Sequence, residues 1–253
     1  MLISRISYVT LSFRANVVSR EIFISINMFR EEDFSRLEIN LDGCLENYRY
    51  FRSKLEDSTR LLVLVKANAY GHGAVEFASV MEEAGADYLA VAYPVEGIEL
   101  RQAGIKSPII VLTAGTDSFE QIINYGLEPG IPNIYSLKLL CDVLEKRGMS
   151  DFPVHIKLDT GMHRLGFMTE ELDELLDFLK TCSRVKVKSV YSHLAAADDP
   201  ACDDFTLGQI DLFKKNADRL SEAVGYKPLY HVLNSAGIER FSQYQSDMVR
   251  LGI

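Results

Sequence analysis

The sequence predicts an α/β protein built as a single (β/α)8 barrel, and three observations support this prediction. Short apolar runs alternate with amphipathic segments of helical spacing, which indicates parallel strands covered by helices. Eight such strands follow the first helix, and a length of 253 residues suits one barrel, which typically has about 250. No GxGxxG motif follows the first of them, which counts against a dinucleotide-binding doubly wound sheet.

Each element has its own pattern. LEINL (37–41) alternates as a short strand, and DGCLENYRYFRSKL (42–55) has apolar residues at helical spacing. Eight apolar strands are then expected at 61–66, 88–93, 108–113, 127–131, 153–159, 185–194, 229–234 and 247–253. Helices are expected between them at 74–85, 95–104, 118–126, 136–148, 170–182 and 205–224. Four of these helices end at a glycine (Gly85, Gly104, Gly126 and Gly148), and Gly225 follows the helix at 205–224, so a glycine can terminate each of the five.

Residues 1–34 are expected to be a disordered appendage, and residues 35–253 to form the barrel. The N-terminal stretch scatters arginines among its apolar residues, so it makes neither a signal-peptide core nor a transmembrane helix. A formal charge of −9 disfavours nucleic acid and anionic membrane surfaces as partners. The four cysteines are widely spaced and form no CxxC pair, which argues against a metal site and for reduced thiols in the cytoplasm.

Polar residues gather where the predicted strands end, and in such a barrel active residues lie at these carboxyl ends. They are Lys66, Tyr70, Lys157, Arg164, His193, Asn234, Ser235 and Arg250, with Gly252 and Ile253 finishing the last strand. Taken singly, each has an ordinary structural explanation. A surface lysine in a loop is the ordinary explanation for Lys66. Their convergence on one mouth favours a functional site instead.

Lysines, arginines and hydroxyls in one pocket suit a dianionic phosphate, whose oxygens are bound by N–H groups and hydroxyls. A lysine there, made neutral by burial and cationic neighbours, can attack an aldehyde and form a Schiff base. Pyridoxal 5'-phosphate carries both an aldehyde and a phosphate, and its pyridine nitrogen needs a hydrogen-bond partner such as an arginine. We therefore predict pyridoxal 5'-phosphate as the cofactor.

Five runs resemble the signature motifs of alanine racemase, in that family's order and at its spacing. They are VKANAYGHG (65–73), KLDTGMHRLGF (157–167), SHLAAAD (192–198), LNSAG (233–237) and VRLGI (249–253). The resemblance runs from about Leu37 to the last residue. It implies a cofactor-binding (β/α)8 barrel, a separate C-terminal β domain, a homodimer, and an isomerase that interconverts L- and D-alanine for peptidoglycan synthesis.

The resemblance also implies roles for individual residues. The cofactor-binding residues would be Lys66, Tyr70, His193, Asn234, Ser235, Arg250, Gly252 and Ile253. Lys66 would carry the cofactor on its side-chain nitrogen and act as the base on one face of the substrate carbon. The phosphate would be bound by the side chains of Tyr70 and Ser235 and by the backbone of Gly252 and Ile253.

Arg250 would donate a hydrogen bond to the pyridine nitrogen, and His193 would hold Arg250 in place. Because arginine has a pKa above about 12, it does not give up its proton to the ring. Arg164 would contact the cofactor's phenolic oxygen and the substrate carboxylate. Lys157 matches a lysine that is often carbamylated in the family, and a carbamate there would orient Arg164. The catalytic set would thus be Lys66, Arg164, His193 and Arg250.

Racemisation needs a second base on the opposite face of the substrate. In the family this base is a tyrosine of the partner subunit's C-terminal β domain, and neither that domain nor the last barrel helix has a counterpart among these 253 residues. We therefore expect this chain to supply the cofactor-binding barrel. The alternative is a non-catalytic, single-barrel protein for pyridoxal-phosphate homeostasis. A decarboxylase of the same fold type fits the Tyr70-Gly71-His72-Gly73 run less well, and a purely structural barrel fits the five motifs least.

Overall fold

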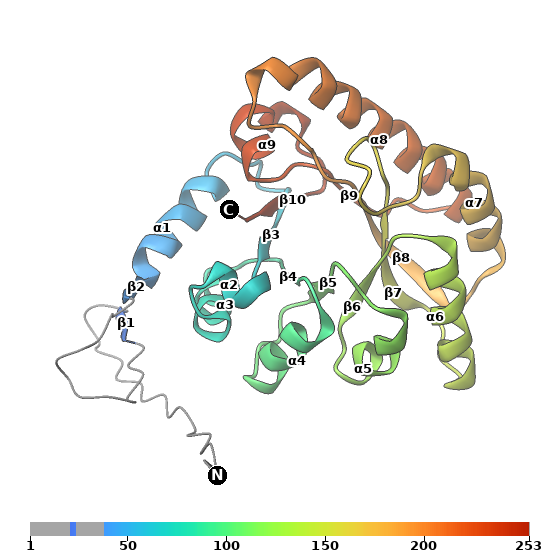
Figure 1. Ribbon diagram of the computed structural model, residues 1–253, viewed down its shortest axis with the longest axis horizontal. Helices are drawn as coiled ribbons and strands as arrows, with labels where there is room; N and C mark the ends of the chain where they lie inside the picture. The colour runs from blue at the N-terminus through green and yellow to red at the C-terminus, as the bar shows by residue number, and fades with distance from the viewer. Residues whose placement is uncertain (1–20, 24–37, 253) are drawn as a thin grey trace, which may run out of the picture.

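Eight parallel strands form a nearly closed barrel in the computed structural model, which describes residues 21–23 and 38–252 (Figure 1). Around the barrel they follow the order β10-β3-β4-β5-β6-β7-β8-β9. Their bounds are Arg60–Leu64 (β3), Tyr88–Val91 (β4), Ile109–Val111 (β5), Glu128–Ile131 (β6), Phe152–Lys157 (β7), Val185–Tyr191 (β8), Leu229–His231 (β9) and Met248–Leu251 (β10). At the remaining seam the Arg250 N–H donates to the Leu233 carbonyl at 3.0 Å. The predicted (β/α)8 fold is confirmed.

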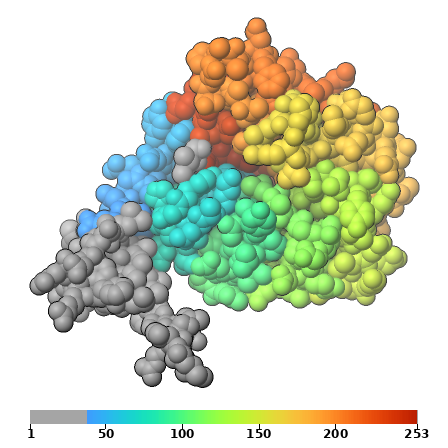
Figure 2. Space-filling model, in the orientation of Figure 1, coloured from blue at the N-terminus to red at the C-terminus, as the bar shows by residue number. Residues whose placement is uncertain are grey.

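Helices cover the outside of the strands in chain order. They are α1 (Leu41–Arg52), α2 (Lys66–Tyr70), α3 (Ala74–Glu83), α4 (Pro94–Gln102), α5 (Phe119–Asn124), α6 (Ile134–Lys146), α7 (Leu172–Thr181), α8 (Asp203–Val224) and α9 (Ser235–Arg240). In the space-filling view the colours run in the same order around the molecule, so that the last residues return beside α1 (Figure 2). Of the described helices, none is both long and apolar enough to cross a bilayer.

All seven predicted helices are found, and each of the five predicted glycine terminators has a positive φ. The sequence did not predict the single turns α2 and α9, which are too short to show helical periodicity. The predicted strand at 37–41 is seen as β2 (Glu38–Asn40), paired antiparallel with β1 (Glu21–Phe23). The expectation of a disordered appendage at 1–34 otherwise lies outside the described residues, as does Ile253.

The barrel interior has an apolar half and a polar half. Strands β10, β3, β4 and β5 contribute a small buried cluster of Leu62, Leu64, Tyr88, Ala90, Ile110 and Met248. Strands β6 to β9 instead carry Glu128, His155, Ser189, Tyr191 and His231, which contact one another by hydrogen bonding or ring stacking. Because alternate residues of a strand point to opposite faces, both sets line the inside, while the larger core lies between strands and helices.

Gly130 on β6 makes room for one of these interior side chains. A Cβ atom added to Gly130 would lie 2.5 Å from the Tyr191 hydroxyl and 3.2 Å from the Val111 carbonyl oxygen. Any side chain at position 130 would therefore displace the tyrosine. This contact explains why a strand with the unpromising sequence EPGI still belongs to the barrel: the missing side chain is replaced by a ring from β8.

Candidate active site

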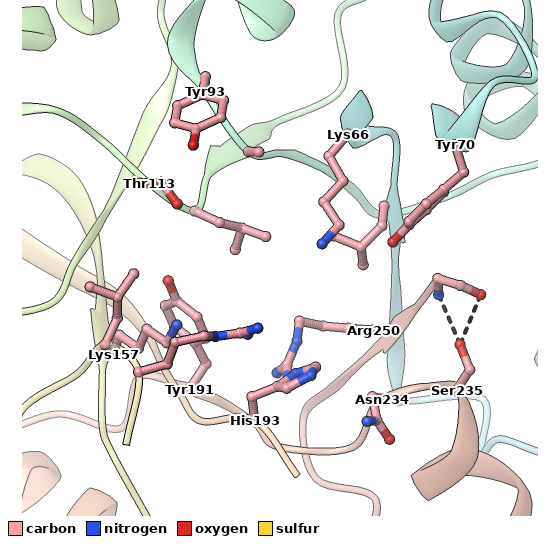
Figure 3. Close-up of a pocket in the computed structure, with 16 residues that line it drawn as sticks. Lys66, Tyr70, Tyr93, Thr113, Lys157, Tyr191, His193, Asn234, Ser235 and Arg250 are labelled. Carbon is pink, nitrogen blue, oxygen red and sulfur yellow. Dashed lines mark hydrogen bonds between the residues drawn. The ribbon is translucent and has the colours of Figure 1, made fainter. Parts of the chain in front are cut away.

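A cavity of about 470 Å³ opens at the carboxyl ends of the barrel strands (Figure 3). Nine of the predicted site residues line it: Lys66, Tyr70, Lys157, Arg164, His193, Asn234, Ser235, Arg250 and Gly252. The tenth, Ile253, lies outside the described residues. None of the described lining residues is Asp or Glu, so the side-chain charges of the cavity are positive. Such a cavity suits an anionic ligand.

The half-buried Lys66 follows β3 directly and begins a strained turn. The four residues from Ala67 to Tyr70 all have φ between 49° and 55°, the left-handed region that costs about 1–2 kcal/mol per non-glycine residue. The Asn68 side chain steadies the turn by accepting from the Ala74 N–H at 2.8 Å. Strain of this kind persists only when the surroundings enforce it, and it concentrates at functional sites.

The turn aims Lys66 and Tyr70 into the same space. The Lys66 Nζ lies 5.7 Å from the centre of the Tyr70 ring, and Figure 3 shows both side chains entering from one side of the cavity. Glu96 on α4 ties this turn to the neighbouring strand end. Its carboxylate accepts from the backbone N–H groups of Ala67 at 2.6 Å and Ala92 at 2.7 Å. Glu96 therefore fixes the carboxyl ends of the successive strands β3 and β4 relative to each other.

Ser235, Gly252 and Tyr70 form a polar cradle on the same side. The Ser235 Oγ accepts from the Gly252 N–H and donates to the Gly252 carbonyl, both at 2.9 Å. A Cβ atom on Gly252 would lie 2.9 Å from the Tyr70 hydroxyl, so the close approach of that hydroxyl requires glycine. Two hydroxyls beside a backbone segment that carries no side chain at Gly252 are groups that suit a phosphate.

Arg250 is 4% exposed and is fixed by an unusually complete set of acceptors. Its Nη1 donates to the His231 carbonyl at 2.8 Å, and its Nη2 donates to the Ser192 carbonyl and, at 3.2 Å, to the Val232 carbonyl. The predicted partner His193 places Nδ1 3.4 Å from Nη2, which is the longest of these contacts. The three carbonyls, and not His193 alone, therefore hold the guanidinium. None of these hydrogen bonds involves the Arg250 Nε.

Burial, and next the neighbouring cations, lower the pKa of two groups in the cavity. Burial, with the charges of Arg164 and Arg250, lowers the pKa of Lys157 to about 8, against a smaller opposing effect of Asp159. Burial, and then the charge of Arg250, lowers the pKa of His193 to about 3. At neutral pH His193 is therefore uncharged, as an acceptor for Arg250 must be. At pH 7 about a tenth of the Lys157 amines are neutral.

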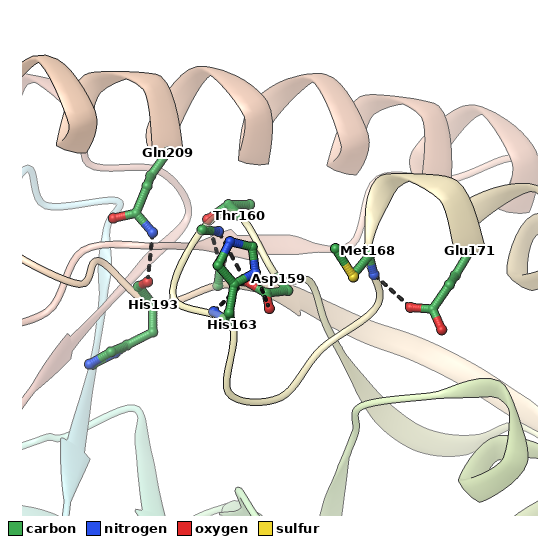
Figure 4. A network of polar contacts seen from close by, with 9 residues as sticks. Asp159, Thr160, His163, Met168, Glu171, His193 and Gln209 are labelled. Atoms are coloured by element: carbon green, nitrogen blue, oxygen red, sulfur yellow. Dashed lines mark hydrogen bonds and ion pairs between the residues drawn. The ribbon is translucent and has the colours of Figure 1, made fainter.

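The loop after β7 carries the exposed Arg164 to the cavity. Asp159 shapes this loop by accepting from the N–H groups of Gly161 at 2.9 Å and His163 at 3.1 Å, and it forms an ion pair with the His163 ring (Figure 4). On the opposite side, Gln209 of α8 donates to the His193 carbonyl at 3.2 Å (Figure 4). The His163 side chain is 69% exposed and supports the loop through its contacts with Asp159.

Asn234 lines the cavity but uses its polar atoms elsewhere. Its Oδ1 caps α9 by accepting from the Gly237 N–H at 2.9 Å, and its Nδ2 donates to the Leu194 carbonyl at 3.3 Å. Sequence reasoning also missed Tyr191, which lines the cavity two residues before His193. Alternation along the strand could have found it, since residues 189, 191 and 193 share a face in an ideal strand. Its buried hydroxyl has no hydrogen-bond partner among the described residues.

Most of this chain matches a known protein family. The family model for the alanine racemase N-terminal domain matches residues 39–253. The chain belongs to this family. An alanine racemase of Synechocystis sp. is 39% identical over 219 residues, which cover 86% of this chain and 58% of that protein. One from Thermodesulfovibrio yellowstonii is 38% identical over 223 residues, covering 87% and 59%.

Solved alanine racemase structures share the fold. The Clostridium difficile alanine racemase in complex with cycloserine superposes with a TM-score of 0.80 at 34% identity, over 85% of this chain and 59% of that one. The Bartonella henselae alanine racemase with covalently bound pyridoxal phosphate gives a TM-score of 0.76 at 27% identity, over 85% and 60%. The present chain thus spans somewhat under two thirds of the length of these alanine racemases.

Proposed function

We propose that this barrel binds pyridoxal 5'-phosphate on Lys66 and serves an alanine racemase that interconverts L- and D-alanine. The observation that carries the proposal is the placement of Lys66 beside the Tyr70, Ser235 and Gly252 cradle, with Arg250 fixed across the same cavity. The covalently bound cofactor of the Bartonella henselae relative supports it. The residues fit the cofactor, because the hydroxyls of Tyr70 and Ser235 beside Gly252 suit a phosphate, and no described lining carboxylate opposes it.

When bound, pyridoxal phosphate supplies an electron sink that makes the α-proton of an attached amino acid acidic. Lys66 removes or returns this proton on the face that the β3 end presents. Arg250 would donate an N–H to the pyridine nitrogen and would keep its own proton, because its pKa, though lowered to about 10 by burial, stays well above neutrality. An arginine that keeps its proton would not protonate the ring, and this would restrain side reactions.

Arg164 and Lys157 serve the substrate end in this proposal. A neutral Lys157 amine adds to carbon dioxide, forming a carbamate with loss of a proton, and its lowered pKa makes that amine available near neutral pH. The carbamate turns a cation into an anion beside Arg164, which it would orient toward the substrate carboxylate. Without the carbamate, the two positive groups repel one another.

Inversion also requires an acid–base group on the face opposite Lys66. We propose a homodimer in which this group is a tyrosine of the partner subunit's C-terminal domain, as the family resemblance implies, and a cytoplasmic role in supplying D-alanine for peptidoglycan. In this proposal Lys66 is the acid–base group that the barrel supplies. One positioned acid–base group contributes about 10²–10⁴-fold in rate.

The test is to incubate the 253-residue chain with pyridoxal phosphate and L-alanine in heavy water. We expect incorporation of deuterium at the α-carbon to be about 10²–10⁴-fold faster than formation of D-alanine, since one of the two bases is present. Fusing a family C-terminal domain should bring the two rates together, and Lys66→Ala should abolish both. Efficient D-alanine formation by the chain alone would place the second base within these residues. No exchange in a cofactor-loaded chain would favour the non-catalytic carrier.

A further inference from the structure

A chain of hydrogen bonds crosses the polar half of the barrel from Arg250 to Glu128. The Arg250 Nη1 lies 3.2 Å from the His231 Nδ1, and the His231 Nε2 lies 2.8 Å from the Ser189 Oγ. The Ser189 Oγ lies 2.6 Å from the His155 Nδ1, and the His155 Nε2 lies 2.8 Å from the Glu128 Oε2. Each step joins side chains of neighbouring strands, from β10 to β6.

The chain is buried except at its far end. Ser189, His155 and His231 are 0% exposed, whereas the Glu128 side chain is 15% exposed. Aromatic rings fix both imidazole planes: the Tyr191 ring stacks on His231 with centroids 5.1 Å apart, and the Tyr88 ring meets His155 edge-on at 6.2 Å. The chain therefore runs from the cavity through the interior to a carboxylate with access to water.

We propose that Glu128, His155, Ser189 and His231 form a one-way hydrogen-bond relay that positions Arg250. Arginine can only donate and an ionised carboxylate can only accept, so both ends of the chain are fixed. His231 must accept at Nδ1 and therefore carries its proton on Nε2, which it donates to Ser189. Ser189 then donates to the Nδ1 of His155, and His155 donates from Nε2 to Glu128.

The other proton arrangements leave a group unsatisfied or two donors facing each other. If His155 carried a proton on Nδ1, it would donate to Ser189, and so would His231. Both histidines would then donate to the Ser189 oxygen, and neither could accept the hydrogen of the Ser189 hydroxyl. A buried hydrogen bond that is not made costs about 1–3 kcal/mol. If Ser189 donated to His231 instead, His231 would present a second N–H to Arg250. Burial, and next the charge of Arg250, lowers the pKa of His231, which also opposes its protonation.

The relay connects the Arg250 guanidinium to a distant carboxylate, that of Glu128, and not to an adjacent one. No carboxylate contacts the guanidinium among the described residues, and its nearest partners are carbonyls and histidines. Successive polarised hydrogen bonds strengthen one another in a low dielectric, so the charge of Glu128 reinforces the bond at Nη1. Resting on the proposed function, this relay holds Nη1 while the Ser192 and Val232 carbonyls hold Nη2, an arrangement that would leave Nε for the pyridine nitrogen.

The relay is tested by ¹⁵N NMR of the full chain labelled at histidine. We expect His155 and His231 to be neutral at pH 7 with the proton on Nε2, and we expect Glu128→Gln to move the ring signals of both. Asp87→Asn is the matched control, because Asp87 precedes β4 and accepts from the Leu61 N–H at 2.8 Å without touching the relay. It should leave the His231 signals in place.

A proton on Nδ1 of either ring, a doubly protonated ring, or a His231 signal indifferent to Glu128→Gln would overturn the relay. The wild-type ring states decide the case even where a variant folds poorly. With pyridoxal phosphate added, Glu128→Gln should weaken binding about 2- to 10-fold, as expected for about 1 kcal/mol of lost reinforcement, and Asp87→Asn should not. Predicted ring states in a chain that takes up no cofactor would support the relay and contradict the proposed function.

Discussion

Lys157 should react with cyanate faster than an exposed lysine, because its amine is partly neutral at ordinary pH. With a pKa of about 8 instead of 10.5, about half of the Lys157 amines are neutral at pH 8, against about 0.3% for an ordinary lysine. This gives an advantage of about 150-fold in neutral amine. A less basic amine is also less nucleophilic, by analogy with thiols, which reduces the expected rate advantage to about tenfold.

The assay is peptide mass spectrometry after brief exposure to cyanate at pH 8, with Lys188 on the exposed face of β8 as the reference. Arg164→Gln is the diagnostic variant, since the Arg164 charge is the largest cause of the lowered pKa after burial. It should slow modification of Lys157 a few-fold and leave Lys188 unchanged. Equal rates at the two lysines, or a Lys157 rate insensitive to Arg164→Gln, would refute the electrostatic reasoning.

Three further substitutions test other parts of the site. Asn68→Ala should cost about 1–2 kcal/mol in urea unfolding, because it removes a cap of the left-handed turn, whereas Asn68→Asp keeps the acceptor and should cost less. Gly130→Ala should cost about 1–3 kcal/mol through the clash with the Tyr191 hydroxyl, and Tyr191→Phe should recover part of that loss; additive effects would contradict the contact. Arg250→Glu should lower cofactor affinity and change the near-visible spectrum of the loaded chain, and an unchanged spectrum would remove Arg250 from the pyridine nitrogen.

The sequence predicted the barrel because each strand is a short apolar run and most strands are followed by an amphipathic helix. It could not predict the turn at Ala67–Tyr70, since Ala and Tyr disfavour a left-handed backbone and tertiary contacts such as those of Glu96 hold it. It also could not predict β1, because a three-residue strand depends on its pairing with β2 and has little pattern of its own.

Some residues of the candidate site could likewise be predicted from the sequence, and others could not. Residues in strand-end motifs, such as Lys66 and Arg250, could be placed because the ends of parallel strands meet at one mouth. The relay could not, because His155 and Ser189 lie within strands and Glu128 begins one, and the sequence does not show which residue of a neighbouring strand each of them meets. His231, the last residue of β9, was also missed, although it contacts Arg250 directly. Contacts between neighbouring strands depend on register, which short strands of this kind do not specify alone.

The position of the cofactor's covalent bond tests the central claim most directly, because two lysines share the cavity. Lys66 lies on the side of the Tyr70 and Ser235 cradle, and Lys157 lies across from it (Figure 3). The measurement is to add pyridoxal phosphate to the full chain, reduce with borohydride and locate the modified lysine by mass spectrometry. We predict a single adduct at Lys66 that disappears in Lys66→Ala. An adduct chiefly at Lys157, or none on the folded chain, would contradict the account.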